Sequence, residues 1–342
     1  MEPLLTIDNL QVQFNLDEGV VRAVDGINLT IPRGTTVCLV GESGCGKSVA
    51  ALSILRLVAP PGRIVSGKIT LHQENGSVDL TALGDESEAI RRVRGEAISM
   101  IFQEPMTSLS PVHTIGNQIV EMIQLHTGLR KAAAKAQAID IMGRVGIPEA
   151  TRRFQQYPYE MSGGLRQRAM IAMALSCTPS LVIADEPTTA LDVTIQAQIL
   201  ELMRTLLCEL GMSILLITHD LGVVAEMAHQ VAVMYLGRIV ETGPVNAIFA
   251  DPQHPYTRAL LNSIPGRSPR KSALQAIPGS VPGPLQQIPG CPFHPRCAER
   301  VAGLCDVGAC PQLFTVSPEH QTACFVRQRE REAAETAKEV TG

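Results

Sequence analysis

The sequence lacks tryptophan and is poor in aromatic residues, which make up 3% of its 342 residues. Proteins that hold single-stranded nucleic acid by base stacking need aromatic side chains, so this class is disfavoured. Basic residues are not in excess either, because 29 Lys and Arg stand against 33 Asp and Glu, for a net charge of −4. Nucleic acid and anionic lipid surfaces bind basic patches. We therefore expect no nucleic-acid partner and no direct electrostatic attachment to a membrane.

Long apolar runs are also missing. No stretch reaches the roughly 20 consecutive apolar residues of a membrane-spanning helix. Residues 1–5 lack the basic and apolar segments of a secretory signal, so we expect a cytoplasmic chain that reaches a membrane only through protein partners. Cysteines in that compartment are not expected to form disulfides, although five of the nine fall between Cys291 and Cys324.

The hydrophobic pattern predicts an α/β fold. Residues 36–40 form a continuous apolar run, as in a buried parallel strand, and a glycine-rich loop and a helix-compatible run over 48–57 follow. Further elements are predicted from the same patterns: strands at 4–7, 12–14, 23–29, 181–184 and 214–217, helices at 132–142, 165–177 and 194–210, and a hairpin at 231–241.

The composition changes after Pro252. Residues 265–295 are dense in proline and glycine and cannot form long regular elements. We therefore divide the chain into a first domain over 1–251, an irregular cysteine-rich extension over 252–326 and a charged tail over 327–342. The tail is expected to be a frayed helix or disordered.

Residues 41–49 carry the clearest chemical motif. Eight of them fit the pattern G-x-x-x-x-G-K-[ST], and the alternative is a chance glycine-rich turn. Between a buried strand and a helix, such a loop curls its backbone N–H groups around a polyphosphate, the lysine reaches the β- and γ-phosphates, and the following hydroxyl binds Mg²⁺. The predicted nucleotide-binding residues are Gly41, Glu42, Ser43, Gly44, Cys45, Gly46, Lys47, Ser48 and Val49.

Two acids follow the apolar run 181–184. Asp185 is expected to hold Mg²⁺, and Glu186 to orient and deprotonate an attacking water. Many strands end in an acidic turn, so these two acids alone are a weak signal. Together with the loop at residues 41–48 they indicate a nucleotide site.

Further motifs resemble those of the ABC ATPases. Residues 161–168 read Met-Ser-Gly-Gly-Leu-Arg-Gln-Arg, Gln103 follows a strand, Ala190-Leu191-Asp192 follows the acids, and His219 follows another strand. Together with the loop at 41–48, they occur in the order of that family. The resemblance implies a P-loop NTPase with a RecA-like core, an antiparallel β subdomain and a helical subdomain at about 104–172.

The same resemblance implies several site roles. ATP and Mg²⁺ are the expected cofactors, with Gln103 as an additional magnesium ligand and Gln103, Glu186 and His219 as the catalytic set. Ser162, Gly163, Gly164 and Asp192 are expected to act in a nucleotide sandwich, in which the first three contact the γ-phosphate held by a second subunit. In physical terms, this motif offers backbone donors at a helix N-terminus.

Two single residues have competing interpretations. His219 is either an ordinary surface or core histidine or a γ-phosphate contact, and its place after a buried strand favours the contact. Phe14 is either a core residue or, by resemblance, the aromatic side chain that stacks on adenine. The hydrophobic pattern explains Phe14 as a core residue equally well, so both interpretations stay open.

A subfamily resemblance extends the comparison to nearly the whole chain. Residues 101–109, residues 186–194 and the segment His254-Pro255-Tyr256-Thr257 resemble ATPases of dipeptide and oligopeptide importers and of related nickel and glutathione importers. Ser110 and Leu165 depart from the family pattern without removing a phosphate-binding group. The implied partners are a second, related ATPase in a heterodimer, two transmembrane permease subunits and, indirectly, an extracytoplasmic solute-binding protein. The implied location is peripheral, at the cytoplasmic face of the inner membrane.

The clustered cysteines leave three alternatives open. Too little apolar sequence surrounds them for a core, which suggests a metal in its place, and zinc is the default although C-x₂-C pairs are lacking. Free thiols are the second alternative. The third comes from the resemblance, since related ATPases hold an iron–sulfur cluster, and it implies a [4Fe–4S] cluster on Cys291, Cys297, Cys305 and Cys324 with Cys310 left over.

The function hypotheses follow from these motifs. The first is the ATP-hydrolysing subunit of a peptide-class importer, and the close alternative is a nickel, glutathione or other importer of the same subfamily. A non-transport ABC ATPase would show a coiled-coil insertion, a tandem second ATPase or a basic surface, and none is present in the sequence. A metal-dependent redox sensor is the remaining hypothesis.

Overall fold

The computed structural model of the chain describes residues 2–74, 76–104, 108–189, 192–264 and 277–341. The strands are β1 (Pro3–Leu16), β2 (Gly19–Pro32), β3 (Thr36–Val40), β4 (Gly62–Gln73), β5 (Gly76–Asp79), β6 (Ile98–Ile101), β7 (Leu181–Asp185), β8 (Ser213–Thr218), β9 (Gln230–Tyr235), β10 (Arg238–Pro244), β11 (Phe314–Ser317) and β12 (His320–Thr322). The helices are α1 (Lys47–Ile54), α2 (Glu88–Arg92), α4 (Ile115–Thr127), α5 (Lys131–Arg144), α6 (Ala150–Arg153), α7 (Gly163–Leu175), α8 (Val193–Glu209), α9 (Leu221–Met227), α10 (Val245–Ala250), α11 (Pro255–Asn262) and α12 (Phe325–Thr341).

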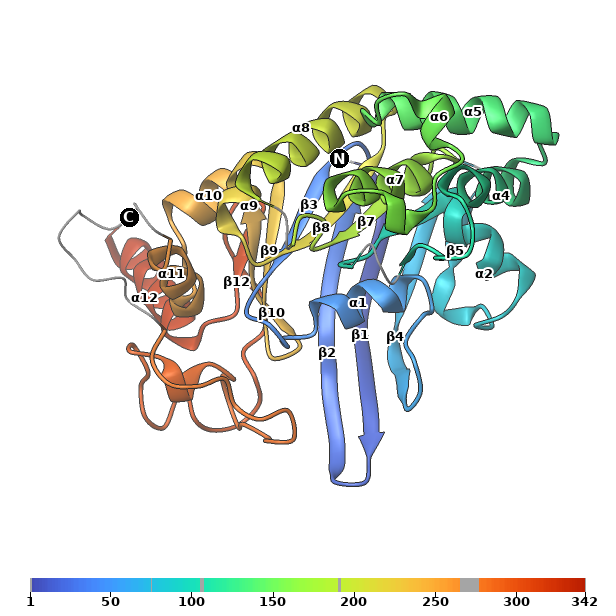
Figure 1. The fold of residues 1–342 in the computed structure, drawn as a ribbon. Coiled ribbons are helices and arrows are strands. Elements are labelled where there is room, and N and C mark those ends of the chain that lie inside the picture. Colours follow the sequence, from blue (N-terminus) through green and yellow to red (C-terminus); the bar gives the residue numbers. More distant parts are fainter. Residues whose placement is uncertain (1, 75, 105–107, 190–191, 265–276, 342) are drawn as a thin grey trace.

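Across the described ranges, the strands build two sheets (Figure 1). The first is antiparallel, in the order β2-β1-β4-β5. The second runs in the order β11-β12-β10-β9-β3-β8-β7-β6 and is parallel from β9 to β6. This is the α/β arrangement that the hydrophobic pattern predicted, and the short strands expected at 4–7 and 12–14 belong to one long strand, β1.

Both faces of the parallel sheet are covered, which explains its continuous apolar strands. In β3, Val37 and Leu39 belong to a core shared with the antiparallel sheet and α1, whereas Cys38 and Val40 belong to a core shared with the helices of the other face. The alternation follows from the strand period of two residues. Because β3, β7 and β8 are parallel, their carboxyl ends meet at one edge of the sheet.

The extension is less irregular than its sequence suggested. β12 pairs with β10 through Glu241–Thr322 and Thr242–Gln321, so the extension adds strands to the edge of the main sheet. These strands were missed because they are short and their partner lies about 80 residues earlier. The tail forms a helix, α12, which is one of the two forms expected for it, and ion pairs one turn apart, such as Arg331–Glu335, support it.

None of the helices in the described ranges combines the length and the apolar character that crossing a membrane requires.

Candidate functional site

The loop between β3 and α1 fits tightly against its neighbours. A Cβ atom on Gly41 would lie 2.2 Å from the carbonyl oxygen of Met234, and one on Gly46 would lie 2.0 Å from that of Ala23. Gly46 also has a φ of +103°, which side chains disfavour. Only glycine fits at these two positions, and the loop therefore packs closely against β9 and β2.

Lys47 begins α1 and points back into this loop. Its side chain is largely buried, since the residue is 5% exposed, and Nζ donates to the carbonyl oxygens of Gly41 at 2.9 Å and Glu42 at 3.0 Å. The Sγ atom of Cys45 lies 3.7 Å from the same ammonium. A buried cation held by neutral carbonyls is a favourable place for an anion such as phosphate.

Asp185 ends β7 beside this loop and is 6% exposed. Burial raises the pKa of Asp185, and the charge of Glu186 adds to the rise, whereas a hydrogen bond from Ser48 and the charge of Lys47 oppose it. Its Oδ1 atom is buried without a hydrogen-bond partner among the described residues. A buried carboxylate oxygen with an open lone pair, next to a hydroxyl, suits a hard cation such as Mg²⁺.

Glu186 is the centre of a second set of contacts. Its Oε2 accepts hydrogen bonds from Gln103 Nε2 at 3.1 Å and Thr189 Oγ1 at 2.9 Å, and its Oε1 lies 3.0 Å from His219 Nδ1. Burial alone would raise the pKa of Glu186, but the hydrogen bonds from His219 and Thr189 and the charges of His219 and Lys47 lower it overall. The side chain is therefore an ionised acceptor at neutral pH.

The backbone of Glu186 is also unusual, because its φ of 48° lies in the left-handed region. Non-glycine residues with such angles cluster at functional sites. The strained turn directly follows a buried strand, which places the carboxylate at the carboxyl edge of the sheet.

One cavity of about 1010 Å³ is lined by several of these groups, although Asp185 is not among the described residues in its wall. Predicted site residues in its lining are Ser43, Gly44, Gly46, Lys47, Ser48, Val49, Gln103, Glu186 and His219. Three other segments, not predicted, also line the cavity: residues 20–23 of β2, residues 236–238 and residues 283–289 of the extension. The proline-rich composition of 283–289 predicted only an irregular segment, and no local pattern links it to a site more than 200 residues earlier.

The structure places Phe14 elsewhere. Phe14 packs against the core between the two sheets, and a Cβ atom on Gly62 would lie 2.5 Å from its ring. Its strand partners are Val21 and Gly62. Phe14 is not among the described residues that line the cavity, so the predicted adenine contact has no support from this geometry.

Residues 162–164 lie on the surface of the chain rather than at its own cavity. Ser162 is the N-cap of α7, Ser162 and Gly163 are exposed, and Gly164 is partly exposed. Asp192 is the N-cap of α8, where it accepts from the N–H of Ile195 at 3.0 Å. Ala190 and Leu191 of the same motif lie outside the described residues.

The extension gathers four of its five cysteines. Cys291, Cys297, Cys305 and Cys324 line one small cavity together with His254. Cys310 instead lines the larger cavity near Lys47. Over the described part of the chain, no group of three or more His, Cys, Asp or Glu side chains is arranged to hold a single metal ion. The iron–sulfur cluster therefore stays a prediction.

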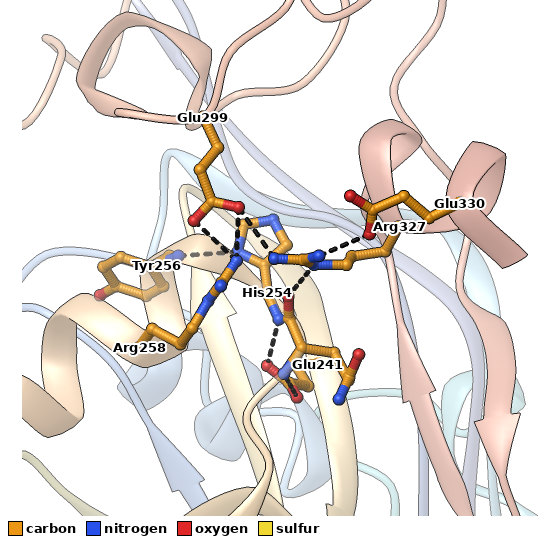
Figure 2. Close-up of polar contacts among 8 residues, drawn as sticks. Glu241, His254, Tyr256, Arg258, Glu299, Arg327 and Glu330 are labelled. Carbon is orange, nitrogen blue, oxygen red and sulfur yellow. Dashed lines mark hydrogen bonds and ion pairs between the residues drawn. The ribbon is translucent and has the colours of Figure 1, made fainter.

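A polar network fastens this cysteine module to the sheet (Figure 2). The fully buried Glu241 of β10 accepts from the backbone N–H of Gln253 at 2.7 Å and of His254 at 2.9 Å, and His320 Nε2 lies 2.8 Å from it. Glu299, two residues after Cys297, binds Arg258 and Arg327. The carboxylate of Glu299 thus links the segment after Cys297 to both α11 and α12.

His254 has one unused hydrogen-bonding atom in this module. Its Nδ1 accepts from the N–H of Tyr256 at 3.1 Å, which places the ring proton on Nε2. No described residue is a partner of this Nε2, which is buried. Burial lowers the pKa of His254 to about 4, so the ring is neutral.

Comparisons with known proteins cover the same regions. A family model described as "ABC transporter" matches residues 24–189, and a model described as "Oligopeptide/dipeptide transporter, C-terminal region" matches residues 240–305. A putative peptide import ATP-binding protein of Brucella melitensis biotype 1 is 51% identical over 332 residues, which cover 95% of this chain and 97% of that protein. A probable peptide ABC transporter ATP-binding protein of Sinorhizobium fredii is 50% identical over 324 residues, 94% of each chain.

Solved structures agree with the fold. A dimeric ATP-binding cassette bound to ADP and phosphate aligns with a TM-score of 0.62 at 24% identity, over 70% of this chain and 98% of that one. CbiO1 from Clostridium perfringens, part of an ABC transporter complex, aligns with a TM-score of 0.61 at 25% identity, over 73% of this chain and 92% of that one.

Proposed function

Because the chain belongs to the ABC transporter ATP-binding proteins of the peptide import family, we propose that it binds and hydrolyses ATP to drive import of di- or oligopeptides. One observation carries the proposal: a buried lysine, Lys47, and an ionised glutamate, Glu186, line one cavity. The buried carboxylate of Asp185, which has an oxygen without a partner among the described residues, directly precedes Glu186 in the chain.

Each group has a distinct task in hydrolysis. Lys47 and the glycine-rich loop bind the β- and γ-phosphates of ATP and offset their charge. Ser48, Asp185 and Gln103 would hold Mg²⁺, which neutralises charge that develops on the phosphate oxygens. Glu186 accepts a proton from the attacking water, and its contact with His219 orients the carboxylate for this transfer.

Residues 162–164 are proposed to complete the site of a second ATPase. Their exposed position at the start of α7, away from the chain's own cavity, supports this role. The proposed partner is a related ATPase in a heterodimer, and a solute-binding protein delivers the peptide to the assembly from outside.

The transporter family implies membrane permease subunits as partners, and a groove next to Gln103 supports their proposed docking site. The groove has a volume of about 730 Å³ and runs between the core and the helical subdomain, with Phe102, Leu125 and Met173 among its lining residues. Phe102 lines the groove while the adjacent Gln103 reaches Glu186, so a helix docked in the groove would act on the catalytic carboxylate. Residues 105–107 of the same loop lie outside the described residues. The proposed location is the cytoplasmic face of the membrane that holds these subunits.

Peptide uptake tests the function in cells. In a strain that lacks this chain, uptake of a radiolabelled di- or tripeptide should fall to background and return with the wild-type gene. Lys47→Ala should not restore uptake, because ATP no longer binds, whereas the exposed-site change Lys135→Ala should. Restoration of nickel or glutathione uptake, with peptide uptake unaffected, would reject the peptide assignment.

We also propose that the cysteine module holds a [4Fe–4S] cluster. Two features support the fit: four thiols line one cavity, and a buried His254 N–H in its wall lacks a partner in the described structure. Four cysteine thiolates are the usual ligand set of such clusters, and nearby N–H donors stabilise their sulfur atoms. The cluster would supply an inorganic core for a segment with few large apolar side chains.

Iron analysis tests the cluster. Anaerobically purified protein should contain about four iron atoms per chain and absorb in the visible range. Serine at any one of Cys291, Cys297, Cys305 or Cys324 should remove the absorbance, and Cys310→Ser should keep it. Stoichiometric zinc, or loss of iron on the Cys310 change, would refute this ligand set.

A further inference from the structure

The second residue of the phosphate-binding loop is held by the extension. Arg296 donates from both terminal nitrogens to the two carboxylate oxygens of Glu42, at 2.7 Å and 3.0 Å. The side chain of Arg296 is 5% exposed and that of Glu42 24%. Exposed ion pairs add little to a structure, but a bidentate pair with a buried guanidinium fixes geometry as well as charge.

Tyr256 holds the same residue from another direction. Its hydroxyl oxygen accepts the backbone N–H of Glu42 at 2.9 Å. The Tyr256 ring is fully buried and packs on Tyr235 and Phe293, with ring centroids 4.7 Å and 5.3 Å away. Since aromatic packing fixes the ring, the hydroxyl offers Glu42 a single position.

The carbonyl of Glu42 completes the arrangement, because it accepts from Lys47 Nζ. The N–H, the carbonyl and the side chain of this one residue are therefore all engaged, two of them by the extension. Displacing Glu42 would move a partner of the phosphate-binding ammonium. Without Arg296, the negative charge of the Glu42 carboxylate would be uncompensated beside the proposed polyphosphate site.

We propose that Arg296 and Tyr256 are positioning residues for ATP binding, so that the extension forms part of the nucleotide site. Arg296 neutralises Glu42 and sets its side chain, and Tyr256 sets its backbone. This inference rests on the proposed ATPase function, since it names what orders the same loop.

ATP affinity of the full-length chain tests the inference. With a fluorescent ATP analogue and Mg²⁺, Arg296→Met should weaken binding about tenfold, as expected for loss of a buried charge-assisted pair. The exposed neighbour Arg300 provides the control, and Arg300→Met should bind within about twofold of wild type. In assays of hydrolysis, KM should rise while kcat stays nearly constant, because Arg296 touches no reacting group.

A double variant separates positioning from folding. If Glu42 is harmful once unpaired, Glu42→Gln combined with Arg296→Met should bind ATP more tightly than Arg296→Met alone. A purely structural loss would not be repaired by a second change. Wild-type affinity in Arg296→Met, or no recovery in the double variant, would overturn the role of Arg296.

Tyr256→Phe gives an independent measurement should Arg296→Met not fold. It keeps the buried ring and removes only the acceptor of the Glu42 N–H, so affinity should fall about threefold. Unchanged affinity would overturn the inference in that case. Failure of the wild-type chain itself to bind ATP more tightly than Lys47→Ala would instead reject the proposed function.

Discussion

Replacing Glu186 with glutamine is expected to lower the rate of ATP hydrolysis about 10²–10⁴-fold, the usual contribution of a positioned general base. Glutamine keeps the shape of the side chain and can still contact Thr189 and His219, but it cannot accept a proton from water. ATP binding should remain, because Lys47 and the loop are untouched, and the closed dimer should accumulate. Phosphate release under saturating ATP and size-exclusion chromatography with ATP measure the two effects.

The matched control is Glu201→Gln. Glu201 is an exposed glutamate on α8 that pairs with Arg204 of the same helix, so its replacement should leave the rate within about twofold. A Glu186→Gln protein that hydrolyses ATP at the parental rate would disprove the assignment of the base. Because the pKa of Glu186 is lowered by its hydrogen bonds, this carboxylate should be more acidic than an ordinary glutamate and stay ionised at neutral pH.

Replacing Gly163 with aspartate is expected to reduce hydrolysis by at least about 10²-fold without weakening ATP binding to the chain's own loop. A carboxylate there would face the γ-phosphate bound by the partner ATPase and repel it. The fold should tolerate the change, because a Cβ atom on Gly163 meets no atom within 4 Å and an acidic residue in the first turn of a helix is favourable. A loss of hydrolysis in a folded Gly163→Asp protein would therefore indicate that Gly163 belongs to a site shared between subunits.

Gly143→Asp is the control for this prediction. Gly143 is an exposed glycine of α5 whose Cβ position is also open, but it lies away from residues 162–164 in the sequence and belongs to another helix. Its hydrolysis should match the wild type when both are assayed with the partner ATPase. Full activity of Gly163→Asp, or of a wild-type monomer at any concentration, would contradict the shared site.

Local sequence was sufficient to predict the strand, loop and helix that form the proposed phosphate-binding part of the site. Gly41 and Gly46, Lys47 and Ser48 lie within one strand–loop–helix unit, so their spacing alone specifies the geometry. Asp185 ends β7 and Glu186 directly follows it, and the apolar run of that strand indicates that it is buried. The order of the remaining motifs led to the same family that the comparisons establish.

The tail and the short strands of the extension show where such reasoning ends. Charged residues at 327–342 left a frayed helix and disorder as alternatives, and ion pairs one turn apart accompany a helix, α12. β12 could not be predicted because its pairing with β10 depends on chain packing rather than on its own three residues. Local pattern also left Phe14 undecided, and in the structure Phe14 is partly buried against the core between the two sheets.

The sequence by itself predicted the phosphate-binding loop and determined which acid follows β7, because those properties depend on neighbours along the chain. Only the tertiary structure decided that Gln103, Glu186 and His219 share one network, since parallel strands bring their carboxyl ends to one edge. It alone joined Arg296 to Glu42, 254 residues apart. Contacts of this kind form when packed elements meet in space, and no local spacing encodes them.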